Sequence, residues 1–324
     1  LIVTGIAIAN PPGFPEPAAF SLDRLKLDVG LRGLLTRIVA VSEARVDNAA
    51  ATIVRNRDGD LNLVVMKKSM EKKPEGPVPP EPPPPEKKPE PRPPTSPDAA
   101  PASKLPPLMI GESSIRTTLA YVDHALSDEV FRLTLALAVD SRNISTYELP
   151  GGKWGTFEIR GHLAENPRSF VINLQGKLAP LLDPEQPSFD LSGDIADVDL
   201  SRMQAVVKEI GLSSESVALN VSVRCRDGQF DRKMSSIAVR FKNARPEGKL
   251  AKRLKGMPLK ADLSVVVPIS GTVKKTRFHW EEALLRSLLE NTASILQGIP
   301  EDNAVLDKNS TKLLKELGQA LEKK

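Results

Sequence analysis

The stretch Phe131-Arg-Leu-Thr-Leu-Ala-Leu-Ala-Val139 determines the fold that we predict for this chain. Its odd-numbered residues are all apolar, whereas the residues between them are Arg132, Thr134, Ala136 and Ala138. Successive side chains of a β-strand point to opposite faces of the sheet, so this alternation predicts a strand with one apolar face.

The same alternation recurs along most of the chain. It is carried by Phe157, Ile159 and Leu163; Phe170, Ile172 and Leu174; Val217, Leu219, Val221 and Val223; Ile237, Val239 and Phe241; and Leu263, Val265, Val267 and Ile269. The pattern predicts a mainly β protein, built as a long antiparallel sheet with one apolar face. Leaving such a face in water costs tens of kcal/mol at about 1.5–3 kcal/mol per side chain. The face therefore closes on itself, meets a second sheet, or holds something apolar.

Four regions follow from composition and periodicity. Residues 1–66 read as an N-terminal β segment, with a last strand over 61–66. Residues 67–107 contain sixteen of the twenty-nine prolines and predict a disordered insertion. Residues 108–280 form the main β-sheet region, and residues 281–324 form C-terminal helices.

Local signals refine this division. Within the strand expected over 20–31, the apolar positions change from even to odd numbers, which predicts a bulge near Asp23. A capping box at Ser201 and a stop at Gly211 predict one short internal helix. Apolar stripes over 280–296 and 305–321 predict two amphipathic helices, which either pack on the sheet or lie on a membrane.

Composition narrows the classes of partner. The net charge of +4 and the pI near 9.0 suit an anionic membrane surface but lack the dense basic stripe of a nucleic-acid-binding protein, so we expect no nucleic-acid partner. Cys225 is the single cysteine, which excludes an intrachain disulfide and leaves the compartment open. No apolar run approaches the roughly 20 residues of a membrane-spanning helix. The chain starts without Met in what reads as mid-strand, so we expect an upstream segment able to carry a signal or anchor.

Catalytic and metal-binding patterns are missing from the sequence. His124, His162 and His279 are isolated from one another, and no H-E-x-x-H, G-x-S-x-G or P-loop motif occurs. We expect a protein that is not an enzyme, with no catalytic residue, no metal site and no cofactor. A site assembled from distant residues, as in an all-β hydrolase, stays open as an alternative. The aspartates at 194, 197 and 199 fit solvated turns better than a calcium site, because their spacing misses the EF-hand pattern.

One segment of the chain concentrates positive charge. Between 240 and 260 the only acid is Glu247, whereas the basic residues are Arg240, Lys242, Arg245, Lys249, Lys252, Arg253, Lys255 and Lys260. Placed on a strand end and its loop, these residues form either a rim that attracts anionic lipid headgroups or a solubilising loop.

Several short motifs resemble the AsmA-like family of bacterial envelope proteins. They are Asn10-Pro11-Pro12-Gly13-Phe14, a Leu-x-Leu-x-Val strand over 25–29, Arg57-Asp58-Gly59-Asp60-Leu61-Asn62, Tyr121-x-Asp123, and Ile269-Ser270-Gly271-Thr272-Val273 leading into Phe278 and a Leu-rich helix. The resemblance covers nearly all of the chain outside 67–107. It implies a curved, groove-like sheet related to bridge-like lipid transfer proteins, in the periplasm of a Gram-negative bacterium and anchored to the inner membrane by a segment upstream of this chain.

Together these patterns give two main hypotheses. In the first, the protein binds membrane lipids, phospholipids foremost, in a hydrophobic β-groove and supports lipid transport or outer-membrane homeostasis; the groove residues that we predict are Leu133, Leu135, Leu137, Leu219, Val221 and Val265. In the second, the protein is an envelope assembly factor with a closed β core that acts through contacts with envelope protein partners.

Overall fold

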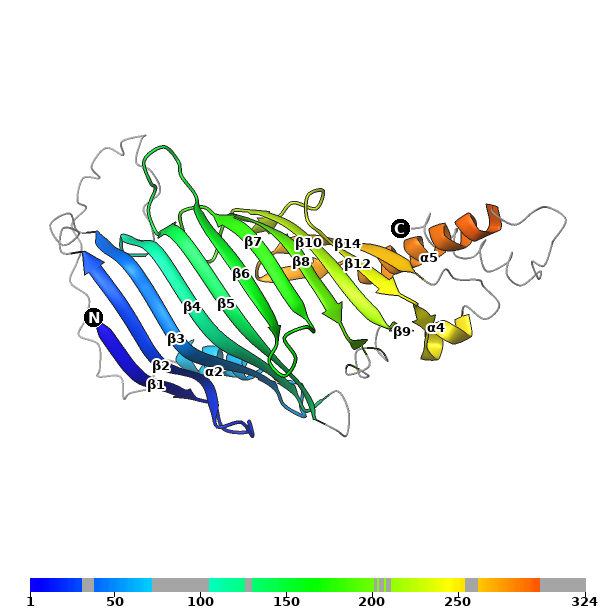
Figure 1. Cartoon of the computed structure of the whole chain (residues 1–324), viewed down its shortest axis with the longest axis horizontal. Coiled ribbons are helices and arrows are strands. Elements are labelled where there is room, and N and C mark those ends of the chain that lie inside the picture. The colour runs from blue at the N-terminus through cyan, green and yellow to red at the C-terminus, as the bar shows by residue number, and fades with distance from the viewer. Residues whose placement is uncertain are drawn as a thin grey trace, which may run out of the picture.

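The computed structural model describes residues 1–30, 38–71, 105–125, 130–200, 203, 207, 211–253 and 262–297. Strands make up 60% and helices 11% of the structure, and the largest element is a sheet of thirteen strands. The predicted mainly β fold with few helices is therefore confirmed. The sheet is long and twisted, and its strands cross its long axis one after another (Figure 1).

The strands follow one another across the sheet almost in chain order. They are β1 (Ile2–Ala9), β2 (Ala18–Gly30), β3 (Val39–Arg55), β4 (Leu108–Asp123), β5 (Phe131–Ser145), β6 (Gly155–Leu163), β7 (Val171–Leu178), β8 (Phe189–Val198), β10 (Ser216–Arg226), β11 (Gln229–Phe230), β12 (Ser236–Lys242), β14 (Leu263–Thr272) and β15 (Lys275–Phe278). Two further short strands, β9 (Leu212–Ser213) and β13 (Arg245–Pro246), pair only with each other.

One pairing departs from the antiparallel sheet that we expected. β3 and β4 run parallel from the pair Val39–Leu108 to the pair Arg55–Asp123, so the sheet is mixed. Parallel neighbours require a crossover connection of a dozen residues or more, and the chain between Arg55 and Leu108 provides it. The predicted N-terminal segment and the main β region thus belong to one sheet, and residues 72–104 of the predicted insertion lie outside the described residues.

The segment 61–66 was predicted as a strand, and this prediction is wrong. Asn62 begins helix α2 (Asn62–Glu71), beside one end of β3 (Figure 1). The Asn62 Oδ1 accepts hydrogen bonds from the backbone N–H of Leu63 and of Val54 in β3. This side chain caps the new helix and anchors it to the sheet, which outweighs the β propensity of Val64 and Val65. The helix also extends beyond position 67, where we placed the start of the insertion.

The change from even-numbered to odd-numbered apolar residues in β2 does not come from the bulge near Asp23 that we predicted. Both ladders of β2 keep their register past Asp23, whereas a register shift lies between Val46 and Ala49 of β3, against β4. Gly5 of β1 and Asn48 of β3 have positive φ angles of 70° and 52° at the same level of the sheet. Three neighbouring strands thus share the irregularity, and apolar side chains before and after it stay on one face.

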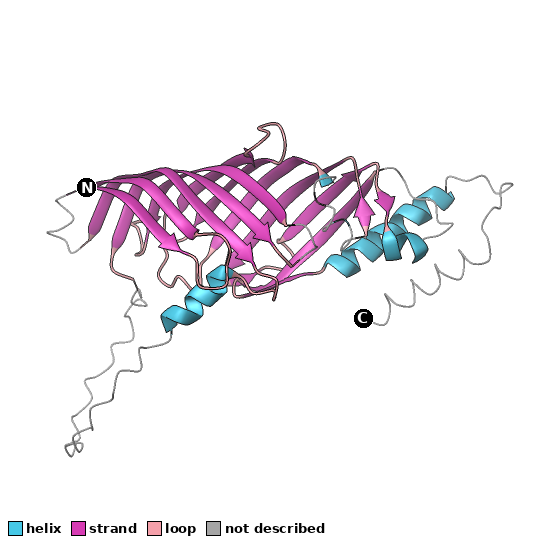
Figure 2. Ribbon diagram, turned by 90° about the horizontal axis from the view of Figure 1, so that it is seen from below, coloured by secondary structure: helices cyan, strands magenta, loops and turns pink. Residues whose placement is uncertain are grey.

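Helix α5 (Trp280–Gln297) confirms the predicted amphipathic helix over 280–296. Its Ala283, Leu284 and Leu288 are buried in a core cluster with residues of β12 and β14. Figure 2 shows α5 against one side of the sheet at its C-terminal end. The short helix α4 (Gly248–Arg253) follows β13. The helices predicted within 201–211 and over 305–321 fall mainly or wholly outside the described residues.

Candidate functional site

Cross-strand register aligns the apolar side chains into two rows that run the length of the sheet. Partners in a ladder lie on the same face, so each row can be followed from strand to strand. The first row is Val3, Leu25, Val46, Ile115, Val139, Ile159, Leu174, Gly193, Val221, Ile237 and Val267. The second row is Ile6, Leu22, Ala49, Thr117, Leu137, Gly161, Ile172, Ile195, Leu219, Val239 and Val265.

These two rows form a surface that we call the apolar strip. None of its side chains is charged, none is aromatic, and Thr117 is the one polar residue in the two rows. The rows cross eleven strands, so ten inter-strand steps of about 4.8 Å give a length of about 48 Å. The strip is therefore a smooth aliphatic surface that runs along the long axis of the sheet.

Access to the strip changes along its length. At β12 and β14 three of its four residues are buried, namely Val239, Val265 at 0% and Val267 at 3% exposure, because α5 packs at this end. At β4 to β7 the residues of the first row, such as Val139 and Ile159, are only half-buried. The main contacts of the described helices are with β3, β13 and β14. The first row is thus accessible in the middle of the strip, whereas Ile172 of the second row is buried and the α5 end is closed.

Two glycines on the face of the strip, one in the second row and one beside the first row, make room for large neighbouring side chains. A Cβ atom at Gly161 would collide with the Leu137 side chain, and one at Gly176 would collide with the ring of Phe157. Leu137 and Phe157 are the cross-strand partners of these glycines, so each large side chain lies down over the neighbouring strand. A bulky residue covering a glycine is a known device for stabilising sheets.

The six predicted groove residues share this face. Leu137, Leu219, Val221 and Val265 belong to the two rows, and Leu135 and Leu133 lie at the next two levels of β5. Leu133, Leu135, Leu137 and Leu219 are half-buried, whereas Val221 and Val265 are buried. The structure therefore brings all six to one surface but divides them between its open and closed parts.

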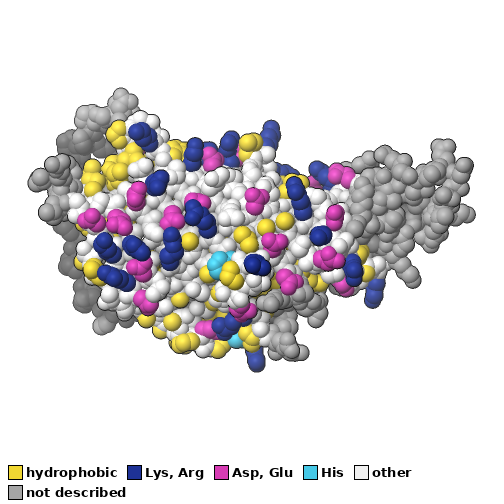
Figure 3. Space-filling model, in the orientation of Figure 1, with side chains coloured by type: hydrophobic (Ala, Val, Ile, Leu, Met, Phe, Trp, Pro, Cys, Tyr) yellow, Lys and Arg dark blue, Asp and Glu magenta, His cyan; other side chains and the backbone are white. Residues whose placement is uncertain are grey.

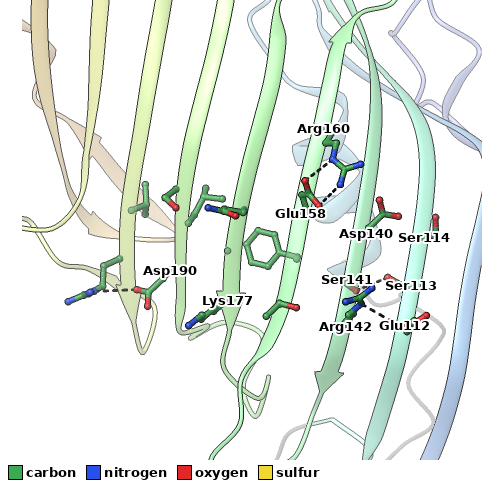
Figure 4. A pocket seen from close by; sticks show the side chains of 18 of the residues that line it. Glu112, Ser113, Ser114, Asp140, Ser141, Arg142, Glu158, Arg160, Lys177 and Asp190 are labelled. Atoms are coloured by element: carbon green, nitrogen blue, oxygen red, sulfur yellow. Dashed lines mark hydrogen bonds and ion pairs between the residues drawn. The ribbon is translucent and has the colours of Figure 1, made fainter.

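The opposite face of the sheet is polar, and Figure 3 shows Lys, Arg, Asp and Glu side chains spread over one face of the molecule. A trough of about 920 Å³ crosses it from β4 to β10 and is shown in Figure 4. Ion pairs join many of the charged residues that line it: Glu158 with Arg160, Glu112 with Arg142, and Asp190 with Arg224. Glu158 and Arg160 are two residues apart on one strand, whereas the other two pairs join neighbouring strands and require knowledge of the register.

The arginines shift the acid–base equilibria of the carboxylates on this polar face. Hydrogen bonds from Arg116 lower the pKa of Asp140, and hydrogen bonds from Arg160 lower the pKa of Glu158. Hydrogen bonds from Arg226 likewise lower the pKa of Asp190. These carboxylates stay ionised and paired at neutral pH, which describes a solvated, neutralised surface rather than a poised acid or base.

The predicted basic rim is only partly within the described residues. Arg240 and Lys242 are exposed at the end of β12, on the polar face, and Arg245 is exposed in β13. Lys252 is exposed in α4, which also contains Lys249 and Arg253. Lys255 and Lys260 lie outside the described residues. Arg240 and Lys242 therefore border the closed end of the sheet, on the side away from the apolar strip.

Four residues of the motifs that resemble the AsmA-like family, Asn10, Asn62, Tyr121 and Asp123, make polar contacts near one end of β3 and β4. The Asn62 Nδ2 donates to Asn10 Oδ1 at 2.7 Å and to the Thr52 carbonyl at 2.8 Å. The Tyr121 hydroxyl donates to the buried Asp123 at 2.6 Å, and Arg55 pairs with the same carboxylate at 3.6 Å. These contacts hold α2 and the strand ends together, so these four residues have a structural role.

Tyr121 gives this network a dependence on pH. Burial, followed by its hydrogen bond to Asp123, raises the pKa of Tyr121 from 10.0 to about 12. The folded protein thus holds the phenolic proton more tightly than the unfolded chain, so this stabilisation is complete below pH 10.0 and is lost as the pH rises towards 12. We expect the free energy of unfolding, measured by urea titration, to decrease across this pH window. In Tyr121→Phe this decrease should be smaller. Tyr147→Phe is the control, and an unchanged slope in Tyr121→Phe would assign the fall to other groups.

Other candidate groups do not assemble into a chemical site. Within the described ranges, no three side chains of His, Cys, Asp and Glu lie where they could hold a metal ion. Cys225 is buried, and burial raises the pKa of its thiol. His279 contacts Ser270 at 2.8 Å and Glu282 at 3.9 Å, which joins the end of β14 to the start of α5. None of the helices in the described part of the chain is both long and apolar enough to cross a membrane.

No protein-family model, curated protein or solved structure matches this chain. The resemblance to AsmA-like proteins therefore remains a prediction from the sequence motifs.

Proposed function

We propose that the apolar strip binds the acyl chains of membrane lipids, and that the protein handles lipids in the bacterial envelope without catalysing a reaction. The observation that carries this proposal is the uncharged aliphatic strip, whose first row stays accessible from β4 to β7. A soluble sheet normally covers such a face or makes it polar, because exposed apolar surface is costly.

The dimensions and chemistry of the strip suit this ligand. An acyl chain gains about 0.8 kcal/mol for each CH₂ group that it removes from water, which is similar to what the bilayer offers. The accessible stretch from β4 to β7 spans three inter-strand steps of about 4.8 Å, or about 14 Å, which is close to the roughly 15 Å of hydrocarbon in one leaflet. Transfer between membrane and strip then needs little net free energy and no covalent step.

The second function is that of an envelope assembly factor with a closed core. The observation that favours it is the buried cluster under α5, where Val239, Val265 and Val267 leave no room for a ligand. In that case the half-buried residues of β4 to β7 would contact a protein partner instead of lipid. Lipid content therefore separates the two functions.

The test is to purify the protein without detergent and to measure bound lipid by native mass spectrometry and by extraction. We expect phospholipid at a stoichiometry of one or more per chain, and renewed loading of delipidated protein from vesicles that contain a fluorescent phosphatidylethanolamine. A parent protein that carries no lipid and takes none from the vesicles would contradict the proposal and favour the assembly factor.

A further inference from the structure

The two ends of the sheet are built differently. At the C-terminal end, β15 is four residues long and contains Lys275 and Arg277, and the neighbouring β14 contains Pro268. Short strands, charges and proline are the usual protection against pairing with another chain. At the other end, the eight residues of β1 include neither a charge nor a proline. Within the described residues, no strand pairs with the outer edge of β1.

The outer edge of β1 presents both hydrogen-bonding groups and apolar side chains. Leu1 and Leu27 exchange two backbone hydrogen bonds of 2.8 Å, so the groups of Ile2 and Thr4 point away from β2 by the alternation of an antiparallel ladder. Leu1, Ile2 and Ile8 are 73%, 56% and 41% exposed. Outward-pointing backbone groups together with exposed apolar side chains make this edge able to pair with another strand.

The sequence of β1 is complementary to itself in one antiparallel register. Leu1, Val3, Ile6 and Ile8 lie on the face of the apolar strip, as their partners in β2 show. If two copies of β1 pair about a two-fold axis between Thr4 and Gly5, Leu1 meets Ile8 and Val3 meets Ile6 of the other copy. Every contact on the strip face is then aliphatic, and no like charges face each other.

We propose that β1 pairs with β1 of a second copy of this chain, so that two sheets join edge to edge into one. The two apolar strips become continuous across the junction, because their first residues, Val3 and Ile6, lie next to the two-fold axis. This pairing depends on the edge alone, so it holds whether or not the strip binds lipid.

The decisive variant is Thr4→Glu. Thr4 is exposed, and its partner on β2 is Arg24, so within one copy the new carboxylate lies beside an opposite charge. Across the two-fold axis, however, the two new carboxylates approach each other and repel. Ser264→Glu is the matched control, since Ser264 is exposed on β14 and faces Arg240 on β12 in the same way.

Sedimentation velocity over a series of concentrations measures the result. We expect the parent and Ser264→Glu to reach twice the chain mass of 35.2 kDa, and Thr4→Glu to require at least a tenfold higher concentration to do so. Thermal unfolding shows that each variant is folded, and hydrogen exchange should show the β1 amides protected in the dimer and open in Thr4→Glu. A parent that stays monomeric up to its solubility limit, or a dimer that Thr4→Glu leaves intact, overturns the proposal.

Discussion

Replacement of Leu135 by aspartate is expected to remove most of the bound lipid while the protein stays folded. Leu135 lies on the half-buried part of the strip face, where water reaches a carboxylate when no lipid is present. In the lipid-bound state the same carboxylate is covered by acyl chains and pays a desolvation penalty. A penalty of about 1.4 kcal/mol already lowers binding roughly tenfold, so we expect at least that loss.

Two matched variants complete this experiment. Ala136→Asp places the same charge on the adjacent residue, which points to the polar face, and should leave lipid content unchanged. Val265→Asp places the same charge on the apolar strip under α5, where Val265 is fully buried. This variant should destabilise the fold by on the order of 5 kcal/mol. Lipid extraction and thermal unfolding of all three variants give the comparison. If Leu135→Asp unfolds as Val265→Asp does, and the parent carries no lipid, the middle of the strip is a closed core.

Replacement of Asn62 by alanine is expected to destabilise the protein by on the order of 3 kcal/mol, because it leaves buried hydrogen-bonding groups unpaired. Asn62 is fully buried and bonds to Val54, Thr52 and Asn10 as well as capping α2. Its removal leaves the buried Val54 N–H without its hydrogen-bond acceptor and releases the loop that contains Asn10. Urea unfolding monitored by circular dichroism measures the loss.

Asn56→Ala is the control for this second prediction. Asn56 lies in the same turn, and its side chain accepts an exposed hydrogen bond from the Asp60 N–H. We expect this variant to lose less than about 1 kcal/mol. Equal losses in the two variants would mean that the turn, and not the buried network of Asn62, limits stability.

The strands and their apolar face are predictable from sequence because they depend on local alternation. The segment 131–139 predicts β5 correctly, and the stripe after Trp280 predicts α5. The parallel pairing of β3 with β4 was not predictable, because the residues that connect them do not indicate whether β4 runs parallel or antiparallel to β3. Helix α2 was missed because its cap, Asn62, acts through partners at Thr52 and Asn10 that are distant in sequence.

The candidate site shows the same division. The apolar positions of β5 and β10 indicate one face, but only the registers show that eleven strands align them into two unbroken rows. The sequence also gives no reason to separate Val265 from Leu135, since the difference comes from the docking of α5. The ion pairs of Glu112 with Arg142 and of Asp190 with Arg224 in the polar trough likewise depend on which residues face each other across neighbouring strands.

The parallel joint between β3 and β4 has a consequence for how the chain folds. Almost every other ladder of the sheet links strands that are adjacent in the chain, whereas Val39 must find Leu108 across the whole crossover. The chain loses the entropy of loop closure before this contact contributes any stability, so non-local pairing is slow. The equilibrium cost is small, since each doubling of the loop length adds only about 0.6 kcal/mol. We therefore expect two hairpin-built halves, β1 to β3 and β4 onwards, to form early and to join late. Until they join, both sides of the joint are open strand edges, and these are the surfaces on which a nascent chain most needs protection from aggregation.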